Sequence, residues 1–487
     1  EHLHYGANMR DIVNYAIKKL EESNIQYGDI RFSDILTQSI QVRNGSVESI
    51  KDNKSKGYGI RIIDKGWGFA SSSELSKDGI DETIKRARKI AKASGKTSEG
   101  VKLKEVEIYQ DTYVNDYKKD PFDIDLEEKI DYLVDANERL DVDDQINVRT
   151  SNFRAWRFLK EFASTEGARI EQELVQCGGG ISVTASDGED VQTRSYPNSF
   201  GGDYGSKGYE FFEKMDLLGN AEKTAQEGVD LLKADQCPEG KMDIILNTNQ
   251  LALQVHESCG HPTELDRALG TEASYAGTSF MTPDKLGKLR YGSDIVHLTS
   301  DATAEGGLGT FGYDDEGVKA KKVDLVKDGI FVGYQASRED AAQVDVEVSG
   351  SMRADGWSNL PLVRMTNINL EPGDWSRSEI IEETDKGIIF DGIKSWSIDD
   401  KRLNFMFGTE AGYLVENGEV KKLIKNPTYT GITYEFWRRC NAISGKEDWK
   451  LHGVPNCGKG EPPQVMRVGH GVAPSRFEDI TVGVGKW

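Results

Sequence analysis

Four short turn sequences constrain the fold of this chain more than any other feature. They are Asn44-Gly45, Asp64-Lys65-Gly66, Asp328-Gly329 and Asn417-Gly418. Tight hairpin turns of type I′ need positive φ at both central residues, and Asn, Asp and Gly accept that conformation most readily. The flanking stretches are strand-like: 39–43, 46–50, 57–63 and 67–71 in the first half, and VDLV, IFVGY, GYLVE and EVKKLI in the second. Antiparallel hairpins are therefore expected in both halves of the chain.

Helical periodicity alternates with these strand signals. Apolar residues recur at helical spacing in 9–23, 80–94, 124–140 and 211–234. The polar stretch 100–120 is expected to be a linker. Residues 145–208 are strand-like, and Cys177-Gly178-Gly179-Gly180 is expected to interrupt them. A boundary is expected at 235–240, which contains Pro238.

These patterns predict an α+β protein in three parts. An N-terminal α+β region with antiparallel hairpins and helices spans 1–100, and a middle α+β region spans 101–235. A large, mainly antiparallel β domain spans 236–487. Its first strand, 242–246, leads into a helix that Asn247, Thr248 or Asn249 can cap.

Composition narrows the class of partner and compartment. The 487 residues carry 61 basic and 82 acidic side chains, a net charge of −21. Nucleic acid or an anionic membrane surface would be repelled, so neither is an expected partner. No stretch approaches the roughly 20 apolar residues of a membrane span, and the first residues, EHLHYGANMRD, lack a signal-peptide pattern. Five scattered cysteines without a C-x-x-C pair favour a reducing, cytoplasmic location.

The helix after that strand carries a candidate metal motif, His256-Glu257-Ser258-Cys259-Gly260-His261. Two imidazoles beside one carboxylate can hold a metal and supply a base. The zinc peptidase spacing H-E-x-x-H puts both histidines on one helical face, whereas five residues separate them by roughly 140°. Gly260 loosens the backbone, and Pro262 disfavours the α conformation at His261. We therefore expect the helix to end near Cys259 or Gly260, with His261 bent back by the next turn.

A catalytic zinc site usually has a third protein ligand. Nearby candidates are the carboxylates of Glu264, Asp266 and Glu272. The distant candidate is Cys457, whose thiol pKa the adjacent Lys459 could lower. The residues alone leave a local carboxylate and Cys457 open on equal terms.

The chain resembles the TldD/PmbA family of metallopeptidases, specifically its TldD-type subunit, which bears the H-E-x-x-x-H motif. The resemblance is carried by GYGIRIIDKGWGFASS (57–72), VHESCGHPTELD (255–266), GTFGYDDEGVKA (309–320), LPLVRMTNINLEPG (360–373), FGTEAGYLVENGEV (407–420) and NCGKG…VGHG (456–471). It implies that His256, His261 and Cys457 hold Zn²⁺ and that Glu257 is the catalytic base. It also implies an N-terminal α+β part followed by a large antiparallel C-terminal part.

Several other residues have two readings. Cys259 is a swapped ligand or, as we favour, a buried inert thiol, and Cys177, Cys237 and Cys440 are expected to be structural. His470 lies near the metal or caps a turn, with His452 and His297 weaker candidates. Asp314-Asp315-Glu316 could accept a peptide amine, but solvated turn residues are the favoured reading. His2 and His4 are given no role.

The expected function is hydrolysis of peptide bonds in unfolded or extended peptides, in peptide maturation or turnover, by a zinc peptidase. The resemblance implies a dimer, either a homodimer or a heterodimer with a homologous subunit that lacks the motif. One alternative is a non-catalytic partner subunit that only binds peptide. Another is a cysteine hydrolase that uses Cys259 or Cys457 with a histidine.

Overall fold

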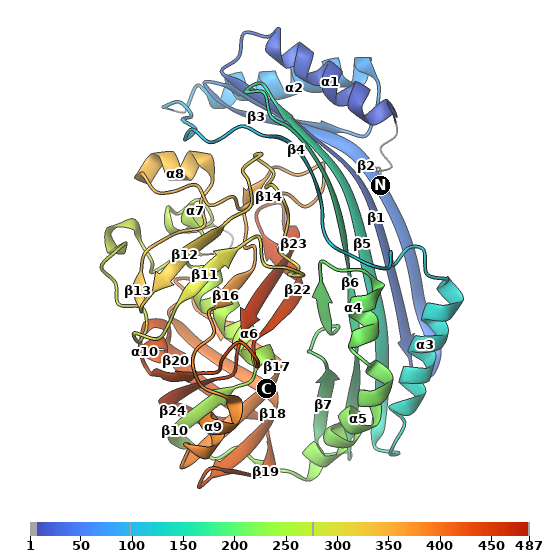
Figure 1. The fold of residues 1–487 in the computed structure, drawn as a ribbon, viewed down its shortest axis with the longest axis vertical. Coiled ribbons are helices and arrows are strands. Elements are labelled where there is room, and N and C mark those ends of the chain that lie inside the picture. Colours follow the sequence, from blue (N-terminus) through green and yellow to red (C-terminus); the bar gives the residue numbers. More distant parts are fainter. Residues whose placement is uncertain (1–6, 98, 275–276, 486–487) are drawn as a thin grey trace.

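The computed structural model describes residues 7–97, 99–274 and 277–485. Its fold is the predicted mixture of helices and mainly antiparallel sheets. Figure 1 shows long curved strands along one side of the molecule, with the C-terminal half of the chain packed against one face of them. His2 and His4 lie outside the described residues. Among the described residues, no helix is both long and apolar enough to cross a membrane.

The first sheet has eight strands in the order β3-β2-β1-β5-β6-β4, with β7 and β8 paired to β6. These strands are β1 (Tyr27–Arg43), β2 (Ser46–Asp64), β3 (Gly66–Ser72), β4 (Gln110–Val114), β5 (Ile146–Ser164), β6 (Arg169–Ser186), β7 (Val191–Tyr196) and β8 (Asp203–Gly205). Asn44 and Gly45 have φ of 49° and 77°, so the first predicted hairpin is confirmed. The predicted stretches 46–50 and 57–63 are two parts of β2, a single 19-residue strand.

The predicted break at Cys177-Gly178-Gly179-Gly180 is wrong, because these residues lie inside β6. The glycines are needed for space. A Cβ at Gly178 would lie 2.0 Å from the Asp203 carbonyl oxygen, and one at Gly179 would lie 2.1 Å from that of Asn152. Glycine in a strand interior can mark such a close backbone approach.

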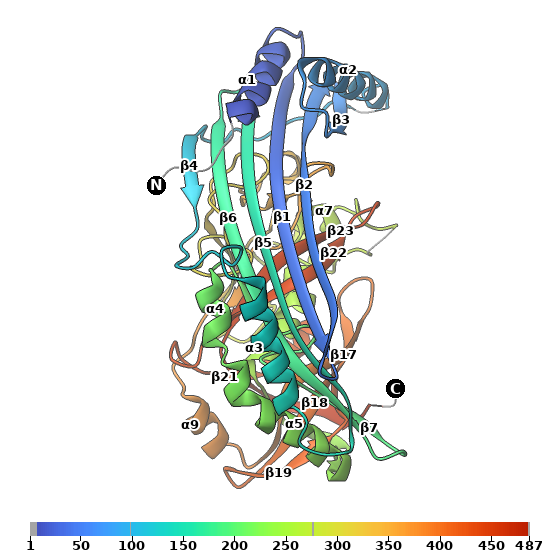
Figure 2. The ribbon, with the colours of Figure 1, turned by 90° about the vertical axis from the view of Figure 1, so that its right-hand side faces the viewer.

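Helices cover the outer side of this sheet (Figure 2). They are α1 (Ala7–Glu21), α2 (Lys77–Ser94), α3 (Leu126–Arg139), α4 (Tyr209–Lys214) and α5 (Leu217–Lys233). The predicted helices at 9–23, 80–94 and 124–140 are confirmed. The one predicted over 211–234 is two helices, separated where Asp216 adopts φ of 48° and caps α5 through Gly219 N. An apolar cluster that includes Leu133, Phe153 and Phe212 joins α3, α4 and the sheet.

The C-terminal half builds a second eight-stranded sheet, in the order β17-β10-β24-β20-β18-β19-β9 with β21 on β24. Its strands are β9 (Asp235–Gln236), β10 (Gly240–Leu246), β17 (Lys386–Ile398), β18 (Asn404–Glu416), β19 (Glu419–Lys425), β20 (Pro427–Ile432), β21 (Cys440–Ile443) and β24 (Ser475–Val484). The predicted turns at Asp328-Gly329 and Asn417-Gly418 have positive φ at all four residues and join antiparallel strands.

Smaller sheets and helices complete this half. The strands are β11 (Leu298–Asp301), β12 (Lys322–Lys327), β13 (Ile330–Phe331), β14 (Met352–Arg353), β15 (Leu362–Val363), β16 (Ile368–Leu370), β22 (Lys450–Lys459) and β23 (Gln464–Val472). The helices are α6 (Thr248–Val255), α7 (Leu265–Ala268), α8 (Arg338–Val344), α9 (Arg377–Glu382) and α10 (Thr433–Arg438), with a short 3₁₀ turn at Pro283–Lys285. The antiparallel pair β22–β23 lies beside α6 (Figure 1). The largest apolar core of the described chain surrounds this region and includes Val255, Cys259 and Met466.

Candidate metal centre

The helix that carries the motif widens into a π-helical turn, His256–Gly260, directly after α6. The amide of His261 donates to the carbonyl oxygen of His256 at 3.2 Å, a bond from residue i+5 to residue i. Such a turn holds five residues where an α-helix holds four, so it brings both imidazoles onto one face. The helix ends at Gly260, within the expected range, but the expected bend at His261 is wrong. His261 itself is helical, with φ of −65° and ψ of −46°, despite the proline that follows it.

Side chains from elsewhere in the chain hydrogen-bond to the carbonyl groups of this turn. The Tyr291 hydroxyl donates to Ser258 O at 2.7 Å, and Gln335 Nε2 donates to Gly260 O at 2.7 Å. Thr263 Oγ1 donates to Cys259 O at 2.7 Å. Buried carbonyl groups need such partners, so these three side chains compensate for the irregular hydrogen bonding. No sequence pattern pointed to Tyr291 or Gln335.

Gly260 is needed for space rather than for flexibility. Its conformation is helical, and a Cβ there would lie 2.4 Å from the Met365 sulfur. Met365 is fully buried in the C-terminal core. The glycine therefore lets the π turn pack closely against the strands behind it.

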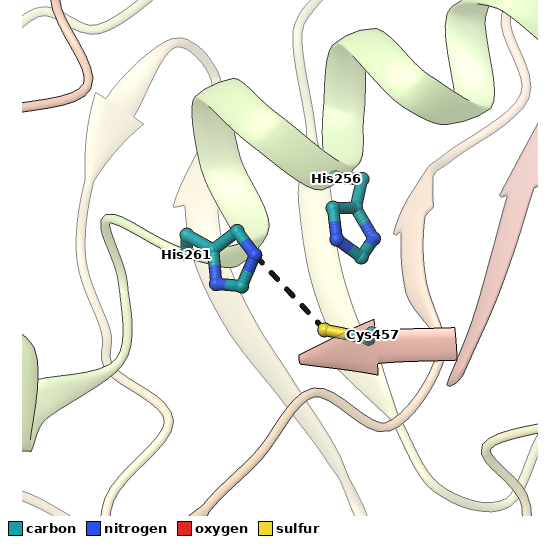
Figure 3. Close-up of side chains that lie close together, drawn as sticks. All are labelled: His256, His261 and Cys457. Carbon is teal, nitrogen blue, oxygen red and sulfur yellow. Dashed lines mark hydrogen bonds between the residues drawn. The ribbon is translucent and has the colours of Figure 1, made fainter. Parts of the chain in front are cut away.

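Three side chains of types that can bind a metal meet in front of this turn (Figure 3). The donor atoms of His256, His261 and Cys457 all lie within 4.8 Å of one another, and all three residues are buried. Cys457 Sγ lies 4.0 Å from His261 Nε2. Two ligands of one zinc ion cannot lie farther apart than the sum of their bond lengths, about 4.4 Å for sulfur and nitrogen. This pair lies within that limit, and the widest separation among the three donor atoms, 4.8 Å, is slightly beyond it. The fold brings the sulfur to the histidines from β22.

The environment of Cys457 favours a thiolate. Burial raises the pKa of the thiol, but the charges of His256 and Arg364 outweigh burial and hold the pKa well below its usual value. Arg364 is buried beside the cysteine and donates to its carbonyl oxygen. Lys459, which we expected to lower this pKa, instead bonds Glu264 Oε2 at 2.7 Å and Asp266 Oδ1 at 2.9 Å. A deprotonated sulfur is the form that binds metals.

His470 fixes the tautomer of His256. His470 Nδ1 lies 3.1 Å from the carbonyl oxygen of Ile368, which can only accept, so Nδ1 carries the proton. Burial and the neighbouring His256 hold the pKa of His470 well below its usual value, so its Nε2 has a free lone pair. That Nε2 lies 2.7 Å from His256 Nδ1, which must then be the donor. His256 Nε2 then faces Cys457, whose thiolate outweighs burial and raises the pKa of His256. A metal would bind this nitrogen in place of a proton.

Glu264 does the same for His261. Its Oε1 lies 2.5 Å from His261 Nδ1, so the carboxylate accepts that proton and leaves Nε2 free to coordinate. Burial raises the pKa of Glu264, but the Lys459 and His261 charges hold it well below its usual value. Glu264 thus orients a histidine instead of acting as the third ligand. Asp266 and Glu272, the other local candidates, also lie outside the donor group.

Glu257 lies in the same cavity, which has a volume of about 450 Å³ and is lined by all three donors. Arg402, at the tip of the β17–β18 hairpin, donates from Nη1 to Glu257 Oε2 at 2.6 Å. Glu257 Oε1 accepts no hydrogen bond from the part of the chain that the structure describes. The carboxylate is therefore held by one oxygen and open at the other. Sequence reasoning did not find Arg402, because its position depends on the hairpin fold.

The other residues that the sequence singled out pack or form hydrogen bonds away from the three donor atoms. Cys259 is fully buried in the apolar core, and burial raises its pKa. All five cysteines are buried and free. Asp314, Asp315 and Glu316 are buried, so the expected solvated turn is wrong; Asp315, for example, pairs with Lys160. His452 bridges Asp203 and Thr248, and His297 pairs with Asp324.

Family models match most of the chain in order. The PmbA/TldA metallopeptidase domain 1 matches residues 28–91, the central domain matches 119–234, and the C-terminal domain matches 239–484. A metalloprotease of Methanocaldococcus jannaschii is 33% identical over 447 residues, covering 91% of this chain and 94% of the relative. A zinc metalloprotease TldD homologue of Saccharolobus solfataricus is 24% identical and covers 88% and 91%.

Solved structures share the fold. TldE from Thermococcus kodakarensis superposes with a TM-score of 0.71 at 17% identity, covering 98% of this chain and 100% of that one. A Thermotoga maritima protein, named as a candidate modulator of a DNA gyrase, gives 0.76 at 17% identity and covers 97% and 99%. At these identities the likeness concerns the fold alone. The family models and the sequence relatives, taken together, show that the chain belongs to the PmbA/TldD family of metallopeptidases.

Proposed function

We propose that this protein is the catalytic, TldD-type member of its family: a zinc-dependent peptidase that cleaves unfolded or extended peptides. One observation carries the proposal. Two imidazoles whose Nδ1 atoms are held by His470 and Glu264, the sulfur of Cys457 and the carboxylate of Glu257 line a single cavity. Three protein ligands with an open fourth position are the usual catalytic zinc arrangement.

His256, His261 and Cys457 would hold the zinc. Imidazole and thiolate are donors that suit zinc, whereas calcium and magnesium prefer oxygen. The name of the Saccharolobus solfataricus relative supports the choice of metal. When bound, the ion would supply a Lewis acid that polarises the scissile carbonyl and acidifies water.

Glu257 would move the protons. Oε1 is free to accept a proton from the attacking water, and the same oxygen can deliver it to the leaving amine. Arg402 pairs with Oε2 and so orients the carboxylate. Arg402 is therefore a positioning residue for the base.

The substrate would be an extended peptide that enters the cavity. Binding through the peptide main chain accepts many sequences and leaves any selection to pockets for individual side chains, which suits a turnover or maturation enzyme. We also propose that the protein works as a dimer, with itself or with a homologue that lacks the motif. A thiolate ligand is open to oxidation, which favours the reducing cytoplasm.

A non-catalytic peptide-binding subunit and a cysteine hydrolase are the competing functions. The decisive experiment is metal analysis of wild type and Cys457→Ala, with mass spectrometry of an unstructured peptide after digestion. We expect one zinc per wild-type chain, chelator-sensitive cleavage, and loss of both in the variant. Zinc without cleavage would favour the binding subunit. Cleavage that survives complete removal of metal would favour the cysteine hydrolase.

A further inference from the structure

The cavity that holds the metal donors has a second, apolar wall. Large apolar side chains line it together with the polar groups: Phe200, Leu253, Ile393, Trp396, Ile398 and Val454. Phe200 is 56% exposed and Trp396 is 46% exposed, although both are large aromatic residues. Their rings meet edge to face with centroids 5.4 Å apart. Two neighbouring aromatic rings left in contact with solvent inside a cavity are suited to receive an apolar group.

The backbone at Phe200 is unusual for an aromatic residue. Phe200 has φ of +56°, and Gly201 and Gly202 follow with φ of 99° and 100°. A left-handed conformation is unfavourable for a residue with a side chain, because its Cβ comes too close to the following carbonyl oxygen. Strain of this kind persists where the surroundings fix it, and it is found often at ligand sites.

Hydrogen bonds fix this segment on both sides. Ser199 Oγ donates to Glu410 Oε1 at 3.1 Å, from the residue before Phe200. Gly201 O, from the residue after it, accepts from Asn152 Nδ2 at 2.9 Å and from the Tyr204 hydroxyl at 2.8 Å. The ring is therefore held in the cavity by its anchored backbone and does not lie there as a loose loop tip.

Helix α6 places this wall next to the proposed base. Ala252, Leu253, His256 and Glu257 all line the cavity, as residues four apart on a helix share one face. Leu253 lies about 6 Å along the helix from Glu257 at 1.5 Å per residue. An extended peptide advances about 3.4 Å per residue. A peptide that runs along α6 would therefore place a side chain one or two residues from the scissile bond on the apolar wall.

We propose that Phe200 and Trp396, with Leu253 and Ile393, form a specificity subsite for a large apolar side chain of the substrate. The substrate class is then extended peptides with Leu, Phe or a similar residue within two positions of the cleaved bond. This inference rests on the proposed peptidase function. It assigns to the aromatic pair a role in choosing which bond is cut.

The test uses an unstructured peptide whose cleavage site has been mapped with wild-type enzyme. Each position within two residues of the bond is changed in turn to Leu, Phe, Ser or Asp, and kcat/KM is measured. Wild type should favour Leu or Phe over Ser by about tenfold or more at one position. Trp396→Ala should reduce that preference to less than about threefold, and zinc analysis of the same samples should still give one ion per chain.

Phe200→Asn removes the aromatic ring with little risk of misfolding. Asn tolerates the left-handed conformation, so the backbone is kept while the apolar ring is lost. Val191→Ala is the matched control, since Val191 is 57% exposed and does not line the cavity. We expect Phe200→Asn to lose the preference and Val191→Ala to keep it.

Two outcomes would overturn the subsite: a wild-type enzyme that cleaves without apolar preference, or variants that slow all peptides equally. Either leaves the proposed peptidase function intact. If zinc-loaded wild type cleaves nothing, the peptidase proposal fails instead. Binding of labelled Leu and Ser peptides to zinc-loaded Glu257→Gln, measured by fluorescence anisotropy, then decides the subsite without cleavage. Equal affinity for the two peptides would overturn it.

Discussion

His256 Nδ1 lies 2.7 Å from Nε2 of His470, a residue 214 positions later in the chain. The contact joins the helix of the motif to β23, the strand paired with the strand that carries Cys457. A histidine that holds the far nitrogen of a ligand fixes its orientation and raises its basicity. The donor set is therefore arranged by groups that do not themselves face the metal.

Replacing His470 by Gln should weaken zinc binding without removing it. Loss of a partner of a ligating histidine typically costs about 10- to 100-fold in metal affinity. The measurement is a zinc dissociation constant from chelator competition. His297→Gln is the control, because His297 pairs with Asp324 outside the donor group. Equal affinities in wild type and His470→Gln would contradict the arrangement.

Glu257→Gln should keep zinc and lose cleavage. The amide cannot accept the proton from water, and removal of a general base typically costs about 10²- to 10⁴-fold in rate. Metal analysis and kcat on an unstructured peptide provide the check. Glu272→Gln, a nearby buried carboxyl outside the donor group, should retain activity. Full activity in Glu257→Gln would exclude this residue as the base.

Cys259→Ala tests whether Cys259 takes the place of Cys457 as the thiolate ligand. Cys259 points into the apolar core, so its replacement should leave zinc content and activity unchanged. We expect only a loss of about 1 kcal/mol in the free energy of unfolding, from a smaller buried side chain. Zinc stoichiometry and urea denaturation measure the two effects. Loss of zinc in this variant would revive the swapped-ligand reading.

Tyr291→Phe should destabilise the protein through the π turn. It leaves the buried carbonyl of Ser258 without its hydroxyl donor, which typically costs about 1–3 kcal/mol. Urea denaturation of the variant gives the value. Tyr15→Phe, whose hydroxyl bonds Asp81 at an exposed position, should change stability by less than about 0.5 kcal/mol. Similar stabilities for both variants would show that the Ser258 carbonyl does not depend on this donor.

Glu161 gives the protein a pH-dependent stability that is unrelated to the metal. Burial, aided by the charge of Glu171, raises the pKa of Glu161 from 4.5 to about 7. The folded state therefore holds an extra proton between these values, and stability falls as pH rises through that window. Glu161→Gln should remove this pH-dependent loss, so its free energy of unfolding at pH 8 should exceed that of wild type by up to about 3 kcal/mol. At pH 4 the variant and wild type should have the same free energy of unfolding in chemical denaturation. An equal increase in stability at pH 4 and pH 8 would contradict the raised pKa of Glu161.

The sequence predicted the hairpins and helices that have strong local signals. Asn44-Gly45 and Asn417-Gly418 form the turns that their backbone preferences require. The 19-residue length of β2 was not predictable, because residues 46–55 are mostly exposed and show no apolar alternation. Gly178 and Gly179 misled the prediction, since the backbones that approach them come from distant segments.

The site was predictable in its members but not in its geometry. The spacing of His256 and Glu257 after a strand indicated a helix-borne site, and resemblance to the family singled out Cys457. The π turn depends on donors such as Tyr291 and Gln335, which no local pattern links to the motif. Arg402 and His470 reach the site only through tertiary structure.

The extra residue between the two motif histidines is absorbed inside the helix and not in a loop. The chain keeps its direction through the turn, while every side chain beyond it is rotated relative to an ordinary helix. A search for two histidines four residues apart would therefore miss this sequence, although both imidazoles lie on one face of the helix. Removing one residue from Ser258–Gly260 to restore that spacing would swing Pro262 and Glu264 out of register with their neighbours and dismantle the pocket.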